Sequence, residues 1–520
     1  MPKLDRQIKT VFINMTKLRY PYSKFWDFCC LLAGIFLTLS FAPFQYAYLA
    51  LTALGFLFAS WLHITPVRAA FRGFLFGLGA FGSGVSWVYI SIHDFGGASV
   101  MASIALTSLF IGVWALFPAL AGYLSVMAMP KNSGLLQILI MPTVWILIEY
   151  TRGYLWLNGF PWLQIAYSQL ETPLAGYIPI LGVYGTGFVL AMTAAAVLTA
   201  FYNKKMRGVL MILIALVWAA GSGLQTIQWT YAIGQPFNVA LLQGNITQDQ
   251  KWRPENKIKT LLRYKRMTEE NWDASVIVWP ETAIPAYLAE VNEAFLQPLH
   301  VEASKRQSDL IISVPAKGAT HNDNYNAVIT LGKHQGMYRK NHLLPFGEYL
   351  PLQPLSGFIL DKLKIRLGDF KPGGANQDLL KAGGYPFITS ICYEDAFGYT
   401  HIRSLHDAAY LVNVTNDAWF GDSLEPHQHL QIAQMRAMET GRFLLRATNT
   451  GVTAIVAPDG KIINQAPLFK TTALRGAITP MAGLTPYSRL GDAAVINVLL
   501  ISLFCMMLYR LILWRKRPKV

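Results

Sequence analysis

Hydrophobic and polar positions follow two different patterns along the chain. Up to about residue 230, and again near the C-terminus, long apolar segments are separated by short polar links. Between about residues 235 and 488, short β-rich runs alternate with polar stretches that are typical of surface helices. A bilayer core requires about 20 mostly apolar residues per helix. Seven apolar segments precede the polar region and one follows it, so the pattern predicts eight transmembrane helices, centred near Ile35, Ala53, Gly82, Val113, Trp145, Met192, Ala215 and Leu503.

Basic residues indicate how these helices are oriented. They gather in the N-terminal arm, in every second link and in the C-terminal tail, whereas the links at 42–46 and 92–100 have none. Because Lys and Arg are retained on the cytoplasmic side of a membrane, this alternation predicts cytoplasmic termini and an external polar region. The first segment has no small-residue cleavage site after it, so we expect a retained helix. The basic link residues are Arg68 and Arg72 after the second segment, Lys131 after the fourth, and Lys204, Lys205 and Arg207 after the sixth.

These patterns predict five parts of the chain. Residues 1–25 form a cytoplasmic arm, 26–230 a membrane domain of seven helices, 235–488 an external domain, 490–513 the eighth helix and 514–520 a basic cytoplasmic tail. The 520 residues are 53% hydrophobic and only 14% charged, whereas about a quarter of a soluble domain is charged. The net charge is +15, and many of the basic residues that produce it flank apolar segments instead of forming one stripe. It therefore favours a lipid bilayer as a partner and argues against nucleic acid.

Strands and helices alternate in the external domain. Helices are expected at 254–272 and 426–440. The alternation predicts a layered α/β domain in which helices cover a sheet. Strands are predicted at 237–242, 275–279, 310–314, 326–331, 386–391 and 410–414, and a hairpin at 453–463.

Three polar side chains follow predicted strands and make a coherent chemical set. They are Glu281, Lys340 and Cys392. Side chains at strand ends converge in a crevice of an α/β sheet. A carboxylate could take the thiol proton while an ammonium stabilises the oxyanion of an acyl-transfer intermediate. Two plainer interpretations stay open at this point: a lone cysteine is often a small buried hydrophobe, and either charge could lie on the surface.

The residues around these three positions resemble a known family. Trp279-Pro280-Glu281, Arg339-Lys340 and Cys392-Tyr393-Glu394 are similar to the Glu-Lys-Cys triad of the nitrilase superfamily. The stretches 342–351, 416–422 and 449–453 look like motifs of the apolipoprotein N-acyltransferase family. The resemblance implies a multi-pass α-helical membrane protein, with eight transmembrane helices and an external α/β nitrilase-like domain that is an α-β-β-α sandwich.

The resemblance also implies a reaction. Members of this family pass a fatty acyl chain from a phospholipid, typically the sn-1 chain of phosphatidylethanolamine, to the α-amine of the N-terminal diacylglyceryl-cysteine of a bacterial lipoprotein. The implied location is the inner membrane with a periplasmic catalytic domain, and neither a metal nor another cofactor is implied. When the roles known in the family are carried over to this sequence, Cys392 is the nucleophile that forms a thioester, Glu281 is the general base and Lys340 is the oxyanion stabiliser. Positions implied to support the site are Glu348, Tyr393, Glu394, Trp252, Asn326, Asn416, Trp419 and Phe420.

Several of these positions have alternative interpretations. Glu394 could simply cap the helix after the nucleophile. Trp419 and Phe420 could be core aromatics or could line an acyl-chain entrance. In the fifth apolar segment, Glu149 and Arg152 could form a local ion pair or a polar site near a lipid head group. Among the histidines His342, His427 and His429, the spacing of the last two argues against a helical metal pair.

The stretch 352–373 mixes apolar and basic residues, which suits a segment lying on anionic lipid, and we expect it to form a lid. The resemblance implies an arginine near this point, and Arg366 is a candidate for it. An ordinary surface connection is the alternative. A membrane-tethered amidase or hydrolase with the same triad is the nearest alternative function, and a transporter or membrane scaffold with a degenerate external domain is the next. We expect a monomer, because the membrane helices would hinder the dimerisation of soluble nitrilases.

Overall fold

The structure is a computed structural model that describes residues 24–129, 134–318, 320, 323–351 and 369–515. The N-terminal arm, Lys131, most of the predicted lid including Arg366, and the end of the basic tail lie outside the described residues.

Each of the eight predicted apolar segments contains a helix in the described part of the chain. Four are long and apolar enough to cross a membrane: α6, α8 with the turn before it, α9 and α17. Helix α4 and the segment Val88–Phe95 make a fifth span if this pair, bent by 62°, is counted as one. The described residues therefore support a multi-pass membrane protein with several apolar helices. The helices are α2 (Lys24–Thr38), α3 (Tyr48–Ser60), α4 (Pro66–Gly84), α6 (Val100–Ala128), α7 (Gly134–Tyr150), α8 (Ile178–Tyr202), α9 (Arg207–Leu224) and α17 (Pro486–Arg515).

The basic residues predicted for the second link lie inside helix α4 instead. The Thr65 side chain accepts a hydrogen bond from the backbone N–H of Arg68 and starts the helix before both arginines. Arg68 and Arg72 each form an ion pair with Asp27 of α2, and Arg72 is 2% exposed. Helix α4 therefore begins within the predicted basic link, and the acidic partner Asp27 allows these arginines to pack against a helix bundle.

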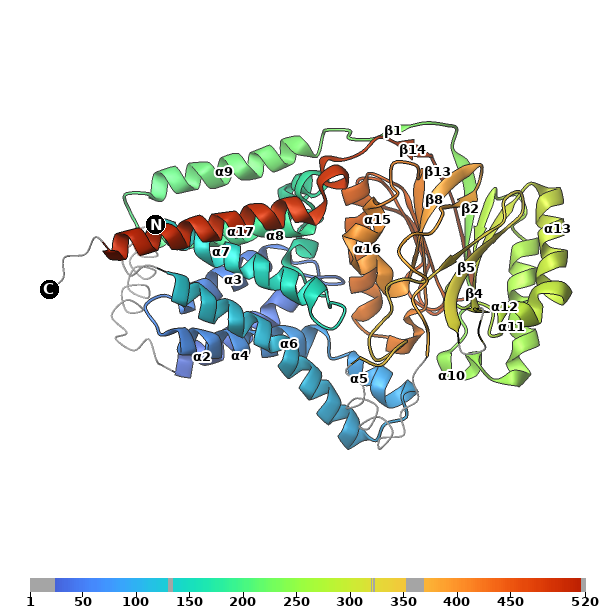
Figure 1. Ribbon diagram of the computed structural model, residues 1–520, viewed down its shortest axis with the longest axis horizontal. Coiled ribbons are helices and arrows are strands. Elements are labelled where there is room, and N and C mark those ends of the chain that lie inside the picture. Colours follow the sequence, from blue (N-terminus) through green and yellow to red (C-terminus); the bar gives the residue numbers. More distant parts are fainter. Residues whose placement is uncertain (1–23, 130–133, 319, 321–322, 352–368, 516–520) are drawn as a thin grey trace, which may run out of the picture.

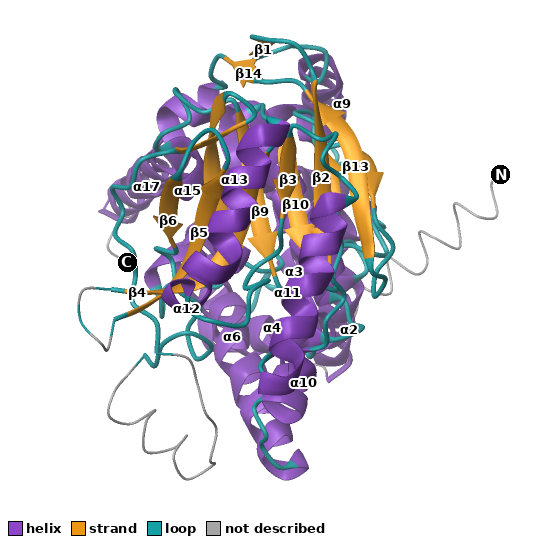
Figure 2. Ribbon diagram, turned by 90° about the vertical axis from the view of Figure 1, so that its right-hand side faces the viewer, coloured by secondary structure: helices purple, strands orange, loops and turns teal. Residues whose placement is uncertain are grey.

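The region after the first apolar helices is a sandwich of two six-stranded sheets (Figure 1). Helices α11 (Pro254–Glu269) and α13 (Gln297–Arg306) cover one sheet, in front of its strands in Figure 2, and α15 (Gly398–Ile402) and α16 (Glu425–Thr440) cover the other. The predicted α-β-β-α layering is confirmed. One sheet has the order β13 (Thr472–Ile478), β2 (Phe237–Gln243), β3 (Val276–Val278), β4 (Asp309–Lys317), β5 (Asn324–Leu331), β6 (Gly336–Arg339); the other has the order β12 (Ile462–Gln465), β11 (Ala454–Val456), β10 (Leu444–Thr448), β9 (Tyr410–Thr415), β8 (Tyr385–Ile391), β7 (Leu380–Ala382).

The strands are buried on both faces because side chains alternate between two cores. In β2, Val239 and Leu241 pack between the two sheets, whereas Ala240 and Leu242 pack under the outer helices. This period of two explains why the strand sequences are nearly continuous apolar runs. The short strands β1 (Tyr231–Ala232) and β14 (Met481–Ala482) form an antiparallel pair where the chain enters and leaves the sandwich.

Helix α16 joins the sandwich to the helix bundle and lies between them in Figure 1. Its residues Ala433 and Ala437 belong to the core against the sheet, whereas Ile432, Met435 and Met438 belong to the core of the bundle. The two parts of the molecule therefore share a continuous apolar interior.

Candidate active site

Cys392 lies at the corner where strand β8 ends and the 3-10 helix η6 (Cys392–Ala396) begins. Its φ angle is +50°, in the left-handed region that non-glycine residues seldom occupy. Such a backbone costs on the order of 1–3 kcal/mol and clusters at functional sites. The corner turns the partly buried thiol out of the sheet at its carboxyl end, as the sequence predicted.

Glu281 and Lys340 come from the opposing sheet and lie together. Glu281 follows β3, and Lys340 follows β6. The Lys340 Nζ atom is 3.9 Å from Glu281 Oε1 and 2.8 Å from Glu348 Oε2. Asn326 links the two carboxylates, because its Nδ2 atom donates to Glu281 Oε1 at 2.7 Å and to Glu348 Oε1 at 3.2 Å. The side chains of Lys340, Glu281 and Asn326 are buried, so water screens these interactions weakly.

The electrostatics of the three reactive groups suit a base-assisted thiol. Burial raises the pKa of Cys392 to about 12, reinforced by Glu281 and opposed by Lys340, so the thiol is protonated at rest. Burial also raises the pKa of Glu281, while Lys340 lowers it. Burial lowers the pKa of Lys340, but Glu348 and Glu281 raise it by more than burial lowers it, so the net shift of this pKa is upward. A fixed ammonium, a buried carboxylate and a neutral thiol therefore lie close enough to act on one another electrostatically.

Glu394 connects the corner that carries Cys392 to the segment that carries Lys340. Its Oε2 accepts the N–H of Ile391 at 2.8 Å. Its Oε1 accepts the N–H groups of Asn341 at 2.7 Å and His342 at 2.9 Å, together with the hydroxyl of Tyr338 at 2.9 Å. Glu394 therefore does cap the helix after Cys392, and the same carboxylate also binds the segment that follows strand β6 of the other sheet.

Comparisons with known proteins agree with this geometry. Residues 33–196 match the model of the apolipoprotein N-acyltransferase N-terminal domain, and residues 238–487 match that of carbon-nitrogen hydrolases. A protein of Methylococcus capsulatus named apolipoprotein N-acyltransferase is 49% identical over 90% of this chain and 93% of its own. Proteins of the same name from Nitrosomonas europaea and Coxiella burnetii are 41% and 39% identical, over 90% and 91% of this chain and 95% and 98% of their own.

The chain belongs to the apolipoprotein N-acyltransferase family. Among solved structures, the nitrilase-superfamily protein Nit3 of Saccharomyces cerevisiae aligns with 48% of this chain and 92% of its own, at 19% identity and a TM-score of 0.37.

The other side chains carried over from the N-acyltransferase family lie at different depths. Tyr393 points away from the thiol into the bundle, where its hydroxyl donates to Gly159 O at 2.7 Å. Asn416 is buried and donates to Gln248 Oε1 at 2.9 Å. Trp252 is 51% exposed. The structure therefore brings neither Tyr393 nor Trp252 into the charge cluster of Glu281, Lys340 and Glu348.

Trp419 and Phe420 lie on the short helix η7 (Asp417–Phe420), which touches the bent segment of the bundle. Trp419 is 40% exposed and packs edge-on against Phe95 at 5.7 Å between ring centroids. Phe420 packs against Trp87 at 4.8 Å. Half-exposed aromatics beside apolar helices fit the entrance interpretation better than a closed core.

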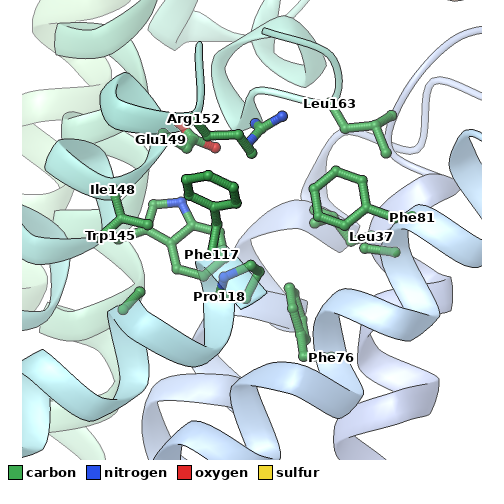
Figure 3. A pocket seen from close by; sticks show the side chains of 12 residues that line it. Leu37, Phe76, Phe81, Phe117, Pro118, Trp145, Ile148, Glu149, Arg152 and Leu163 are labelled. Atoms are coloured by element: carbon green, nitrogen blue, oxygen red, sulfur yellow. The ribbon is translucent and has the colours of Figure 1, made fainter. Parts of the chain in front are cut away.

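Glu149 and Arg152 line a small apolar pocket inside the bundle, beside Trp145 and Phe117 (Figure 3). The ion pair allowed by their spacing is not among the salt bridges of the described residues. Arg152 instead donates from Nη1 to the backbone oxygens of Phe160 at 2.7 Å and Trp162 at 2.6 Å. Helix α7 ends at Tyr150 and continues as a π-helical turn, which changes the spacing that an α-helix would give. The pair braces the following loop, and its access to a lipid head group stays a prediction.

The histidines show a different arrangement from the sequence expectation. His429 Nδ1 is 3.0 Å from Asp417 and 3.3 Å from Glu425, a grouping of donor atoms close enough to hold a cation. The same Asp417 is already 3.2 Å from the guanidinium of Arg446, and His429 Nε2 is 2.9 Å from Asp395. The positive charge of Arg446 opposes a further cation, so we assign the cluster to holding the corner that carries Cys392. His342 and His427 do not take part in this grouping.

Sequence reasoning missed Lys251, which lies directly before the predicted Trp252. Lys251 is 2% exposed, and its Nζ donates to Glu281 O at 3.1 Å and to Thr282 Oγ1 at 2.6 Å. A lysine at the end of a short polar helix gives no signal in the sequence, because such residues are normally solvated.

Proposed function

We propose that this protein transfers an acyl chain from a membrane phospholipid, typically phosphatidylethanolamine, to the α-amine of the N-terminal diacylglyceryl-cysteine of apolipoproteins. The observation that carries the proposal is the buried cluster of Glu281 and Lys340 facing the Cys392 corner, next to a bundle of apolar helices. The names of the curated relatives, which align with 90% of this chain, support it.

In the first half-reaction, Cys392 Sγ attacks the ester carbonyl carbon of the phospholipid while Glu281 takes the thiol proton. The carbonyl oxygen becomes an oxyanion, which the Lys340 ammonium and the backbone N–H of Tyr393 stabilise. When the intermediate collapses, the carbon–oxygen bond of the ester breaks. The leaving lysophospholipid oxygen takes the proton from Glu281, and a thioester remains on Cys392.

In the second half-reaction the acceptor amine attacks the thioester carbon. Glu281 accepts a proton from the amine, and the carbon–sulfur bond breaks as the amide forms. The thiolate then regains a proton from Glu281, so the enzyme returns to its starting state. Both half-reactions use the same base, Glu281, and the same two oxyanion donors, the Lys340 ammonium and the backbone N–H of Tyr393, so the proposed ping-pong transfer needs no metal or nucleotide.

We place the catalytic domain, residues 235–488, on the periplasmic side of the bacterial inner membrane, with both termini in the cytoplasm and eight transmembrane helices. The eight apolar helices and the alternation of basic links support this topology. Residues 1–25 and 514–520 are then the cytoplasmic arm and tail, and the protein works as a monomer. Labelling single introduced cysteines from either side of sealed vesicles tests the orientation.

The test of function is incubation of the purified protein with a phospholipid that carries a labelled sn-1 chain. Label should appear on Cys392 as a hydroxylamine-sensitive thioester, with a burst of lysophospholipid before any acceptor is added. Labelling of a Cys392→Ala variant would refute the assignment. Rapid release of free fatty acid, with no transfer to an added lipopeptide amine, would favour the membrane-tethered hydrolase instead.

A further inference from the structure

A second buried lysine holds the backbone of the general base. Helix α10 (Gln248–Lys251) ends with Lys251, whose ammonium lies against the corner after strand β3. It donates to the carbonyl oxygen of Glu281 at 3.1 Å and to the hydroxyl of Thr282 at 2.6 Å. We propose that Lys251 is a positioning residue that fixes the general base Glu281 and keeps its carboxylate ionised. This inference rests on the proposed function, in which Glu281 is the base.

The corner that Lys251 holds has an uncommon backbone. Thr282 has a φ angle of +44°, a left-handed conformation that β-branched residues rarely adopt. Its N–H donates to Ser313 Oγ on strand β4 at 2.9 Å. Ser313 therefore holds the corner on the sheet side and Lys251 holds it on the other. Such strained residues persist only where the surroundings over-determine them.

Lys251 also balances a charge that Lys340 does not fully neutralise. The Lys340 ammonium lies 2.8 Å from Glu348 but 3.9 Å from Glu281, so its closer partner is Glu348. The charged or titratable groups that act on Glu281 are Lys340, Glu348, Lys251 and Cys392. Among the described residues, the hydrogen bonds of Lys251 go to a carbonyl and a hydroxyl and not to a carboxylate. Burial lowers the pKa of Lys251 to about 8, and Glu281 and Cys392 oppose that shift, which supports mutual stabilisation of the charges.

The consequence is a specific change in pH dependence. Removal of the Lys251 ammonium should raise the pKa of Glu281, because the carboxylate loses a stabilising positive charge. The acidic limb of thioester formation should then move to higher pH. At neutral pH we expect thioester formation to slow by roughly 10- to 100-fold, the effect of losing a charge-assisted contact in a buried site.

The experiment measures single-turnover thioester formation with labelled phospholipid from pH 5 to 9 in the full-length protein, comparing wild type with Lys251→Met, Lys251→Arg and Thr282→Val. Lys257→Met is the matched control, because Lys257 is partly exposed and pairs with Glu290 away from the site. We expect Lys251→Met to shift the acidic limb of the rate profile to higher pH, and Lys251→Arg to return this limb to its wild-type position. Thr282→Val should slow the reaction and leave the acidic limb at the wild-type pH.

The outcomes separate this inference from the proposed function. If wild type forms no thioester, the proposed function fails. If wild type forms it and a folded Lys251→Met variant has an unchanged rate and acidic limb, the positioning role is overturned. Where Lys251→Met does not fold, Thr282→Val decides, since it removes only the hydroxyl; wild-type rates in that variant would overturn the inference as well.

Discussion

Replacing Glu394 with glutamine tests whether the nucleophile corner and the Lys340 segment work as one unit. The carboxylate accepts one hydrogen bond on Oε2, from Ile391, and three on Oε1. Glutamine has nearly the same shape but keeps only one oxygen. If that oxygen stays with the three donors, the new amide meets the N–H of Ile391, and two donors face each other.

The magnitude follows from these contacts. A buried N–H left without an acceptor costs about 1–3 kcal/mol. The three remaining hydrogen bonds lose their charge assistance, which is roughly half of their strength. The sum is on the order of 3–5 kcal/mol, divided between loss of stability and loss of transition-state stabilisation. Since each ~1.4 kcal/mol is a factor of ten, thioester formation should slow by about 100-fold in Glu394→Gln.

The assay is single-turnover thioester formation, together with thermal unfolding of the same preparation in detergent. Tyr338→Phe removes only one donor to Oε1 and should cost about 1 kcal/mol. The double variant should lose less than the sum of the two, because both changes act on one network. Glu255→Gln, an exposed carboxylate on α11, is the control. A Glu394→Gln variant with wild-type kinetics and stability would show that the four contacts do not position the reactive groups.

Two further predictions concern the base and the loop under the nucleophile. In Asn326→Ala the pKa of Glu281, already raised by burial, loses the amide that lowers it and rises further. Activity that needs the carboxylate is present above this pKa and lost below it, so the acidic limb of the rate profile should move to higher pH; an unmoved limb contradicts the reasoning. Gly159 has φ +85°, and a Cβ there would lie 2.0 Å from Gly153 O. Gly159→Ala should therefore lower the thermal unfolding temperature by many degrees, whereas Gly55→Ala, with nothing within 4 Å, should not; equal melting of the two variants would refute the clash.

The parts of the fold that could be predicted from the sequence are those fixed by local periodicity. Strands β2, β3, β8 and β9 were found because their apolar runs are short and bounded by turns. The position of Cys392 at the end of β8 followed from the same pattern. Strand β10 was not predicted, since Arg446 in its middle reads as polar. In the structure Asp395 and Asp417, distant in sequence, neutralise that arginine.

The loop after helix α7 shows a second limit of sequence reasoning. By sequence alone, the aromatic loop 159–162 is typical of an anchor at the lipid interface, but Phe160 and Trp162 are 7% and 2% exposed. Trp162 packs against Tyr393 and His429 of the catalytic domain instead. An apolar aromatic pattern indicates burial, but it does not distinguish burial in lipid from burial against another domain. The contacts of Lys251 with Glu281 and of Glu394 with the Lys340 segment could not be predicted for a related reason, because they join residues that are far apart in the sequence.

The shared core restricts how a lipid can reach the thiol. Swinging the catalytic domain off the bundle would expose Ile432, Met435 and Met438, at about 1.5–3 kcal/mol for each side chain. It would also break the contact of Glu439 with the N–H of Val183 at 2.9 Å, inside the apolar interior. Under the proposed function, both substrates therefore approach Cys392 through local movement at the edge of the interface and not through separation of the domains. The half-exposed Trp419 lies at such an edge, on the short helix η7, which packs against the bent segment of the bundle and against helix α16.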